Sequence, residues 1–279
     1  MALRALWQLF GLFNIVKKIS ISIVTYNSEH IIGACLASLA AHFEHRGYEK
    51  TIQLIDNQSQ DGTAAILRHF AEQNPQFQVI QNACNAGFGR GHNVAIGQAD
   101  SDYHIMCNPD IVINGQTITA LADYMGQHPD IAILCPRLTN ADGSLQPNNH
   151  KLPTLLDLVL RRIAPAWLQR RLQKRMDAYI MLDVGYENIC DVPFVSGAFM
   201  FCRTAVLKQV GGFDGRYFLY FEDADLCRKI HGAGYRTVYY PDASVVHLWE
   251  RAAHKSWRMA WVMSVSALKY FNKWGYRLY

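Results

Sequence analysis

Polar side chains gather at four places in the first part of the chain, each directly after a short apolar run. The clusters are Thr25-Tyr26-Asn27, residues 56–63 (DNQSQDGT), residues 85–93 (NAGFGRGHN) and Asn108-Pro109-Asp110. In an open α/β protein, ligands bind beyond the carboxyl ends of the strands. Polar groups after four successive apolar runs therefore predict a cleft at that edge of a sheet.

Two aspartates of the second cluster call for different interpretations. Asp61 precedes Gly62-Thr63 at the start of an expected helix, where an aspartate side chain caps free backbone N–H groups. Asp56 ends an apolar strand, and no neighbouring residue in the sequence accounts for its charge. Asp56 and Asn57 could simply begin a turn. A carboxylate in this position could also accept a hydrogen bond from the ring N–H of uracil or thymine.

The glycine-rich third cluster differs from a dinucleotide-binding loop. Its spacing is Gly87-Phe88-Gly89-Arg90-Gly91, and it follows the third expected strand rather than the first. The dinucleotide fingerprint requires Gly-x-Gly-x-x-Gly directly after the first strand. The sequence therefore argues against a nicotinamide-binding enzyme.

A second acidic group begins an expected helix late in the chain, at Glu222-Asp223-Ala224-Asp225. Carboxylates are favoured in the first turn of a helix, which accounts best for Asp225. The aromatic residues just before the helix would wall a pocket the size of a sugar; they are Tyr217, Phe218, Tyr220 and Phe221. Gly197, in an expected strand nearby in sequence, would let the backbone approach a ligand closely.

Alternating strands and helices would hold these clusters. Apolar and β-branched runs predict strands, and apolar residues at helical spacing predict helices. The expected strands of the first half are residues 19–25, 51–55, 77–80, 103–107 and 131–135, and the expected helices are 29–43, a helix opened by residues 61–63, 91–97 and 117–125. This order predicts an α/β fold with a Rossmann-like, mostly parallel sheet flanked by helices.

The alternation ends after Pro136, where helical additions are expected. A turn at residues 140–143, a basic helical insertion at about 154–180, a strand at 193–202, a helix at 222–231 and short strands at 236–240 and 244–246 follow in order. We expect three parts: an apolar helix over residues 1–18, a catalytic domain over 19–250 and a basic amphipathic helix over 251–279.

Composition limits the partners that the chain can bind. Of its 279 residues, 50% are hydrophobic and 18% are charged, which is typical of a globular protein, and the net charge of +4 does not indicate nucleic acid. Basic residues cluster, since no acidic residue occurs between Leu158 and Met176 or after Glu250. Basic segments that also carry aromatic residues suggest peripheral binding to an anionic membrane, whereas packing on the catalytic domain is the structural alternative.

The cysteines do not suggest a metal centre. Seven are present and none forms a Cys-x-x-Cys pair, so we expect free, mostly buried thiols in a reducing cytosol.

Together these clusters resemble the family 2 glycosyltransferases, inverting enzymes of the GT-A fold, and most closely their bacterial rhamnosyltransferase-like members. The resemblance covers residues 20 to about 249. Its matching stretches are SISIVTYNSE, LIDNQSQDGT, NAGFGRGHNVAI, CNPDI, FVSGAFMFCR and FLYFEDADLCRKIHGAGY. Six stretches in the right order make the similarity specific.

The resemblance implies roles for particular residues. Asp56 would recognise the nucleotide base, Asp110 would coordinate a divalent ion on the donor diphosphate, and His247 would be a further metal ligand. Asp223 would be the general base, with Glu222 binding the acceptor or orienting the site. Other residues expected to contact substrate are Thr25, Tyr26, Asn27, Asn57, Gly87, Arg90, Asn108 and Gly197.

Simple electrostatics supports a cation here, because a diphosphate leaving group gains negative charge that Mg²⁺ or Mn²⁺ neutralises. Asn108 departs from the Asp-x-Asp motif of the family by supplying an amide in place of a charge. His247 lies in an apolar strand and could instead be a core histidine. If it binds metal, its imidazole favours Mn²⁺.

The resemblance implies transfer of a sugar, with dTDP-rhamnose as the expected donor, to a glycan or lipid-linked glycan in cell-surface polysaccharide assembly. The enzyme would act in the cytoplasm at the inner face of the membrane. UDP-hexose or UDP-galactofuranose donors stay open, because uracil and thymine present the same edge to Asp56. A non-catalytic sugar-binding protein is the alternative from another class. A nucleotidyltransferase would need a glycine-rich basic loop after the first strand, where this chain has Tyr26-Asn27-Ser28.

Overall fold

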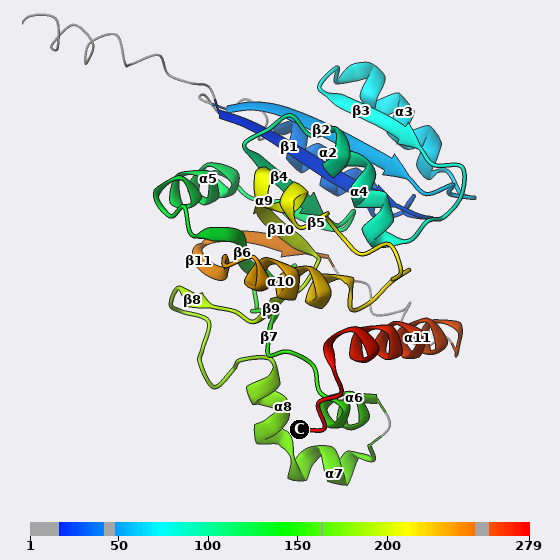
Figure 1. Cartoon of the computed structure of the whole chain (residues 1–279). Helices are drawn as coiled ribbons and strands as arrows, with labels where there is room; N and C mark the ends of the chain where they lie inside the picture. Colours follow the sequence, from blue (N-terminus) through cyan, green and yellow to red (C-terminus); the bar gives the residue numbers. More distant parts are fainter. Residues whose placement is uncertain (1–16, 42–47, 163, 249–256) are drawn as a thin grey trace, which may run out of the picture.

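A computed structural model describes residues 17–41, 48–162, 164–248 and 257–279 (Figure 1). Its main sheet has the strand order β3-β2-β1-β4-β10-β6-β11-β5, with β8 paired to β11. The expected helix over residues 1–18 lies outside the described residues, apart from Lys17 and Lys18, which begin β1.

The first half of the sheet is parallel and alternates with helices. Its strands are β1 (Lys17–Thr25), β2 (Tyr48–Asp56), β3 (Phe77–Gln81) and β4 (Tyr103–Cys107), and its helices are α2 (Ile32–Ala41), α3 (Thr63–Gln73) and α4 (Phe88–Gln98). β1 pairs in parallel with both β2 and β4, and β2 with β3. The carboxyl ends of these strands therefore meet at one edge, as the sequence predicts.

The second half mixes directions. β10 (Phe199–Arg203) lies antiparallel between β4 and β6 (Ile131–Thr139), while β11 (Arg236–His247) runs parallel to β6. β5 (Ile111–Ile113) and β8 (Cys190–Asp191) flank β11 in antiparallel pairs, and α5 (Thr117–Gln127) precedes β6. The predicted mostly parallel α/β sheet is confirmed.

Three details differ from the expected elements. The strand expected at 193–202 is divided into β9 (Phe194–Val195) and β10, and residues 196–198 between them form a turn at the sheet edge. The strands expected at 236–240 and 244–246 are one strand, β11, with a bulge between Tyr240 and Ser244. The short strand β5 was not expected, because its three residues are too few to give a pattern.

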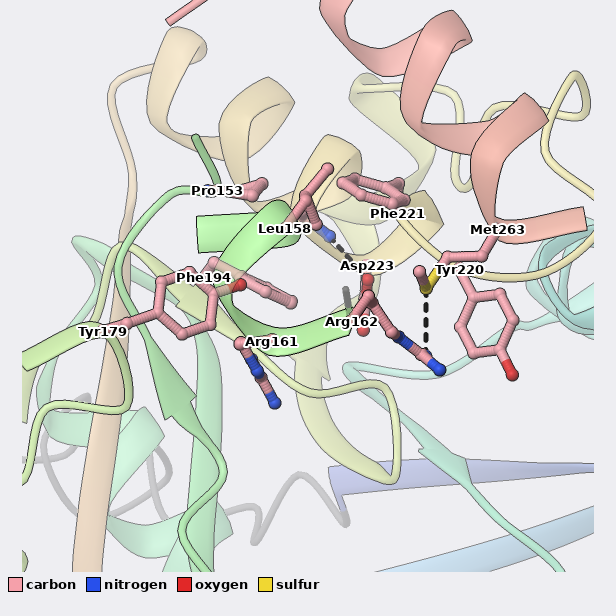
Figure 2. Close-up of a pocket in the computed structure, with 11 residues that line it drawn as sticks. Pro153, Leu158, Arg161, Arg162, Tyr179, Phe194, Tyr220, Phe221, Asp223 and Met263 are labelled. Atoms are coloured by element: carbon pink, nitrogen blue, oxygen red, sulfur yellow. Dashed lines mark hydrogen bonds between the residues drawn. The ribbon is translucent and has the colours of Figure 1, made fainter. Parts of the chain in front are cut away.

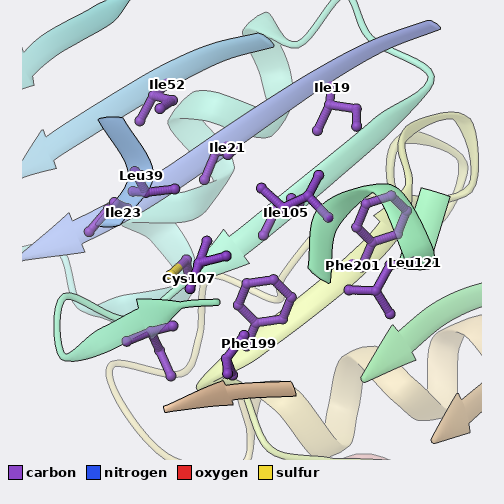
Figure 3. Packing of buried hydrophobic residues seen from close by; sticks show 14 of the residues in the cluster. Ile19, Ile21, Ile23, Leu39, Ile52, Ile105, Cys107, Leu121, Phe199 and Phe201 are labelled. Carbon is purple, nitrogen blue, oxygen red and sulfur yellow. The ribbon is translucent and has the colours of Figure 1, made fainter. Parts of the chain in front are cut away.

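The core between the sheet and its helices is apolar and tightly closed (Figure 3). Ile19, Ile21 and Ile23 alternate along β1 and are almost fully buried, together with Phe199 and Phe201 of β10. Burying such a side chain contributes about 1.5–3 kcal/mol to stability. This packing holds the strand ends, and the polar loops that follow them, in fixed positions.

The opposite face of β1 carries a buried polar network. Ser22 Oγ lies 2.7 Å from His92 Nδ1 and 2.8 Å from His104 Nε2. Burial lowers the pKa of both histidines to about 3, so both are neutral at ordinary pH. These histidines belong to the core and are not free to serve chemistry.

Helical additions pack beside the second half of the sheet. They are α6 (Leu155–Arg162), α7 (Ala166–Arg171), α8 (Gln173–Tyr179), α9 (Thr204–Gln209), α10 (Glu222–Gly232) and α11 (Trp257–Trp274), and β7 (Asn149–His150) pairs with β9 below the main sheet. Figure 1 shows α11 next to α6, where the Leu155 N–H donates to the Arg277 carbonyl at 2.9 Å. Tyr270 and Phe271 of α11 pack with Phe221. The C-terminal helix is thus part of the body near α10.

All seven cysteines are free thiols. Five are buried, Cys190 is half-buried and Cys84 is exposed. The expectation of mostly buried free thiols is confirmed.

Candidate functional site

The ends of β1 and β2 bring the first two polar clusters together. Thr25 and Asp56 are paired across the two strands, and both are fully buried. The Asp56 carboxylate accepts hydrogen bonds from the Thr25 hydroxyl at 3.4 Å and from the Ser59 amide at 3.2 Å. The expectation that nothing local accounts for its charge is therefore wrong, because its own loop supplies an amide donor.

The loops around this pair hold unusual backbone conformations. Asn27 and Gln58 have φ angles of 51° and 59°, which few non-glycine residues adopt. Asn27 Oδ1 accepts the Gln60 N–H at 2.8 Å, and the Asn27 N–H donates to Ser59 Oγ at 3.0 Å. Tyr26 is about half exposed beside them, at 47%. Such backbone strain is concentrated at ligand sites.

Asp61 acts at the start of α3, as expected. Its Oδ1 accepts the Thr63 N–H at 3.1 Å, and its Oδ2 accepts the Glu29 N–H at 3.2 Å. Asp61 therefore orders this loop and is committed to backbone groups.

Asn57 and Gly87 connect three loops. The Asn57 amide donates to the Gly87 carbonyl at 3.1 Å, and the Phe88 N–H donates to the Phe218 carbonyl at 3.0 Å. Gly87 has a φ of 87°, and a Cβ there would lie 2.2 Å from the Phe218 oxygen. Only glycine fits at this junction. Arg90, which is exposed, donates from Nε to the Gly215 carbonyl at 2.6 Å and helps to hold the same junction.

Asp110 and His247 meet at the other side of the sheet edge. His247 Nε2 lies 3.2 Å from Asp110 Oδ2, and its Nδ1 lies 2.5 Å from Gln146 Oε1. Asp110 Oδ1 is buried without a hydrogen-bond partner among the described residues. Asn108 is fixed nearby, because its N–H donates to the Ala198 carbonyl at 2.9 Å.

This pair fits a divalent cation. A neutral His247 ring that donates its Nδ1 proton to the Gln146 oxygen presents its Nε2 lone pair to the Asp110 carboxylate. A proton or a shared metal ion would make that approach favourable, and a histidine whose other nitrogen donates to an oxygen is the usual arrangement of a metal ligand. No group of three or more His, Cys, Asp or Glu side chains suited to a metal occurs within the described residues. Phosphate and water oxygens would have to complete the coordination.

Glu222 and Asp223 begin α10, directly after two aromatic residues in left-handed conformation, Tyr220 (φ 70°) and Phe221 (φ 68°). Asp223 Oδ2 accepts the Gly197 N–H at 3.2 Å, and its Oδ1 accepts the Ala224 N–H at 2.9 Å. Burial raises the pKa of Asp223 to about 6, although these amide hydrogen bonds oppose the shift.

Glu222 is buried more deeply, with 4% of its surface exposed. Burial raises the pKa of Glu222 well above its ordinary value, and the neighbouring Asp223 charge adds to the shift. Its Oε2 has no hydrogen-bond partner in the part of the chain that the structure describes. The two adjacent carboxyl groups thus differ in environment, and Asp223 is the one that reaches a cavity.

Asp225 serves packing. It is fully buried and lies 2.7 Å from Lys273 Nζ, and it accepts the Trp274 indole N–H at 2.7 Å. The expectation that Asp225 is structural holds, but its cationic partner and the indole come from α11, and the Tyr217 hydroxyl also donates to it at 3.3 Å. This ion pair ties α11 to α10.

A cavity of about 460 Å³ lies beside Asp223 (Figure 2). That volume lies within the range of small-molecule sites, about 300–1,000 Å³. Its walls come from α6, α8, β9, α10 and α11, and its lining residues are Pro153, Leu158, Arg161, Arg162, Tyr179, Phe194, Tyr220, Phe221, Asp223, Ala224 and Met263.

Only part of this cavity was predictable. Of the four aromatic residues expected to wall a sugar pocket, Tyr220 and Phe221 do so, whereas Tyr217 and Phe218 are not among the lining residues. The lining residues Arg161 and Arg162 were expected only as part of a basic, membrane-binding segment, and Tyr179 was not singled out. The absence of acidic residues between Leu158 and Met176 was the signal in the sequence that these helices carry an excess of positive charge.

Gly197 lies where the two sides of the site meet. A Cβ at Gly197 would lie 3.2 Å from the Phe88 ring and 3.7 Å from Asp223 Cβ. The glycine-rich loop therefore packs on one side of this residue and the α10 carboxylate on the other. Asn108, bonded to the adjacent Ala198, connects the same turn to Asp110.

Comparison with known sequences identifies related proteins. Residues 20–211 match the family described as Glycosyl transferase family 2, and residues 159–274 match Glycosyl transferase family group 2. The chain is 31% identical over 243 residues to the N-acetylglucosaminyl-diphospho-decaprenol L-rhamnosyltransferase of Mycobacterium tuberculosis, covering 80% of this chain and 74% of that protein. It is 27% identical over 238 residues to rhamnosyltransferase WbbL of Escherichia coli K12, covering 81% and 82%.

Solved structures share the fold at lower identity. TarS of Staphylococcus aureus superposes with a TM-score of 0.57 at 21% identity, over 91% of this chain and 40% of TarS. The mannosyltransferase PcManGT of Pyrobaculum calidifontis, solved with GDP-Man and Mn²⁺, gives a TM-score of 0.57 at 17% identity, over 87% of this chain and 60% of that one. This chain thus spans about two fifths of the TarS chain and about three fifths of the PcManGT chain.

Proposed function

The chain belongs to glycosyl transferase family 2, and on this premise we propose that it transfers rhamnose from dTDP-rhamnose to a lipid-linked glycan in cell-surface polysaccharide assembly. It is a nucleotide-sugar-dependent glycosyltransferase with a GT-A-type α/β fold. The observation that carries the choice of rhamnose is the 31% identity to a rhamnosyltransferase over 80% of the chain.

The nucleotide would bind at the ends of β1 and β2. TarS has been crystallised with UDP and with UDP-GlcNAc, which supports a nucleotide sugar as donor. A carboxylate offers about four acceptor positions, so Asp56 can bind its own loop and still accept a pyrimidine ring N–H. Tyr26 and Asn27, at the exposed rim, would contact the base. Asn57, Gly87 and Arg90 would hold the surrounding loops in shape.

Asp110 and His247 would hold Mg²⁺ or Mn²⁺ against the donor diphosphate. The buried free oxygen of Asp110 and the tautomer of His247 support this assignment. When bound, the ion supplies positive charge that stabilises the leaving diphosphate. Asn108 would contribute a neutral amide beside it, and the Gly197 backbone would lie close to the donor sugar.

Asp223 would be the general base of an inverting displacement. The acceptor hydroxyl oxygen would bond to the anomeric carbon as the bond from that carbon to the diphosphate oxygen breaks. Asp223 would take the hydroxyl proton as this happens. A pKa of about 6 suits the task, because the group is ionised at neutral pH yet can still accept a proton. Glu222, buried behind it, would orient Asp223 and the acceptor.

Peripheral binding to an anionic membrane would bring the enzyme to a lipid-linked acceptor at the inner face of the cytoplasmic membrane. Three tryptophans stand out from α7 and α11: Trp257, Trp261 and Trp167, with exposed fractions of 92%, 71% and 66%. Arg170 and Arg171 lie exposed on α7 beside Trp167. Tryptophan and arginine together suit the interface between water and lipid. None of the described helices is long and apolar enough to cross a bilayer.

A donor-selection assay tests the proposed reaction. The purified enzyme would be incubated with Mn²⁺, a prenyl-diphosphate-linked N-acetylglucosamine and, in turn, dTDP-rhamnose, UDP-glucose and UDP-galactofuranose. We expect transfer from dTDP-rhamnose, with inversion at the anomeric carbon of rhamnose. Transfer from a UDP sugar alone would contradict the donor assignment. Binding of these nucleotides without any transfer or hydrolysis would favour a non-catalytic role.

A further inference from the structure

Two consecutive arginines of α6, Arg161 and Arg162, line the cavity that contains Asp223 (Figure 2). In the view of Figure 2, the Arg161 side chain lies to the left of Asp223 and the Arg162 side chain to the right. The Arg161 guanidinium lies 4.9 Å from the centre of the Tyr179 ring, and Arg162 Nη2 lies 3.0 Å from Met263 Sδ. These contacts position both guanidinium groups without neutralising their charges.

Other basic residues nearby have anionic partners. Arg175 Nε lies 2.8 Å from Asp157, and Lys273 Nζ lies 2.7 Å from Asp225. Neither Arg161 nor Arg162 forms an ion pair with a carboxylate in the described ranges. Both side chains are exposed to solvent, so within the described ranges two guanidinium groups without an anionic partner line the cavity where an acceptor hydroxyl would have to meet Asp223.

The cavity and the proposed metal pair lie on different sides of the same turn. Gly197 contacts Asp223, whereas the adjacent Ala198 bonds to Asn108, next to Asp110. A donor diphosphate held at Asp110 and His247 would leave the two arginines without an anion. An anion in the cavity would therefore belong to the second substrate.

We propose that Arg161 and Arg162 bind the diphosphate of a lipid-diphosphate-linked acceptor and hold its first sugar against Asp223. Guanidinium groups donate paired hydrogen bonds that match phosphate oxygens. Apolar residues of α6 and α11, Leu158 and Met263, would contact the first part of the lipid. Val159 and Trp261, on the same two helices, are exposed apolar residues. This inference rests on the proposed function and specifies its acceptor.

Binding of geranyl diphosphate, a soluble probe without a sugar, tests the proposal directly. Its Kd would be measured by calorimetry with dTDP and Mn²⁺ at saturating concentrations, so that the donor site is already filled. We expect Arg161→Gln and Arg162→Gln each to raise this Kd about tenfold or more, because a hydrogen bond to a charged group is lost. The exposed Arg68→Gln in α3 is the matched control and should leave the Kd unchanged.

Two further measurements separate a specific site from other causes. The affinity for dTDP with Mn²⁺ should be the same in all variants, which shows that the fold and donor site are intact. Arg162→Lys should recover only part of the affinity, because it keeps the charge but loses the forked geometry. An unchanged Kd for geranyl diphosphate in the double variant would overturn the proposal.

A membrane headgroup is the other source of phosphate. Vesicles of phosphatidylglycerol would be sedimented with the same variants. If Arg161→Gln and Arg162→Gln reduce vesicle binding while leaving geranyl diphosphate binding intact, the arginines bind the bilayer and the proposal is wrong. If wild-type protein binds geranyl diphosphate through these arginines but binds no nucleotide, the proposed reaction fails while the anion site stands.

Discussion

The half of the site around β1 and β2 differs from the half around α6, α10 and α11 in how its polar groups are satisfied. At β1 and β2, Asp56 and Asp61 are hydrogen-bonded to backbone amides of their own loop, and Asn57 is hydrogen-bonded to the Gly87 carbonyl of a neighbouring loop. Around α10, Glu222 has a buried oxygen without a described partner, and Asp223 has a raised pKa. Within the described ranges, neither Arg161 nor Arg162 forms an ion pair with a carboxylate.

The difference indicates that the two regions bind their ligands in different ways. A loop whose side chains are already bonded is rigid and binds by shape, at little cost in ordering. Around α10, a buried carboxyl oxygen without a described partner costs stability, and the two solvent-exposed guanidinium groups are open to an anion of a substrate. On this view, the region at β1 and β2 is a preformed nucleotide-binding site, and the region around α6, α10 and α11 binds the acceptor and carries the reaction.

The largest expected effect comes from removing the proposed base. Asp223→Asn should lower transfer by about 10²–10⁴-fold, the usual contribution of a general base. The affinity for dTDP should change little, because the proposed nucleotide site lies at the ends of β1 and β2, away from Asp223. Rates and nucleotide affinities would be measured on the same preparation, and turnover equal to wild type would remove Asp223 from the mechanism.

The pKa of Asp223 also predicts a pH dependence. A base must be ionised, so kcat/KM should rise with pH through about 6 and then level off. The effect on stability has the opposite sign, since a raised carboxyl pKa in the folded state favours folding at low pH. As the pH rises, this stabilising contribution should be lost between the pKa of Asp223 in the unfolded state and its folded-state pKa of about 6. A kcat/KM that is flat between pH 5 and 7 would contradict the assignment of Asp223 as the base. Asp225→Asn is not a suitable control for this experiment, because it disturbs packing.

Much of the first half could be predicted from the sequence, because strand, turn and helix follow one another within short segments. Thr25, Asp56 and Asn108 end apolar strands, and parallel pairing brings such ends together. The cavity could not be predicted in the same way. Its walls come from residues near 153–162, 179, 194, 220–224 and 263, and no local pattern brings such distant segments into contact. Asp223 was expected from the family resemblance, whereas Arg161 and Arg162 were expected only as part of a basic, membrane-binding segment.

Disrupting the ion pair that fastens α11 should affect the second half far more than the first. Lys273→Met leaves Asp225 buried without its cation, which typically costs about 3–5 kcal/mol. We expect a large fall in the urea midpoint and weak binding of geranyl diphosphate. Lys18→Met, which removes an exposed pair with Asp100, should change the midpoint little. Equal midpoints for the two variants would mean that α11 is not held by this pair.

A glycine pair tests how rigid the first half is. Gly87→Ala puts a side chain at a φ of 87° and against the Phe218 carbonyl, so it should cost at least about 1–2 kcal/mol and weaken nucleotide binding. Gly97→Ala, near the end of the α4 helix that follows Gly87 and with open space around it, should be neutral or stabilising by up to about 1 kcal/mol. Thermal unfolding of both variants measures the contrast, and a tolerated Gly87→Ala would show that the junction can rearrange.

The smallest effect is expected at the proposed membrane surface. Trp261→Ala and Arg171→Gln remove exposed groups and should leave dTDP binding and stability nearly unchanged. Both should reduce sedimentation with phosphatidylglycerol vesicles, each by a few-fold. Undiminished sedimentation in the double variant would assign these residues to the solvated face.

Binding of both ligands to two variants tests most directly whether the halves are separate sites that meet at Asp223. Calorimetry would give the Kd of dTDP with Mn²⁺ and the Kd of geranyl diphosphate for Asp110→Asn and for Arg162→Gln. We predict that each variant affects a different ligand. Asp110→Asn weakens only the metal-dependent binding of dTDP, and Arg162→Gln weakens only the binding of geranyl diphosphate. If either variant weakens both ligands equally while remaining folded, a single shared anion site replaces the two proposed here.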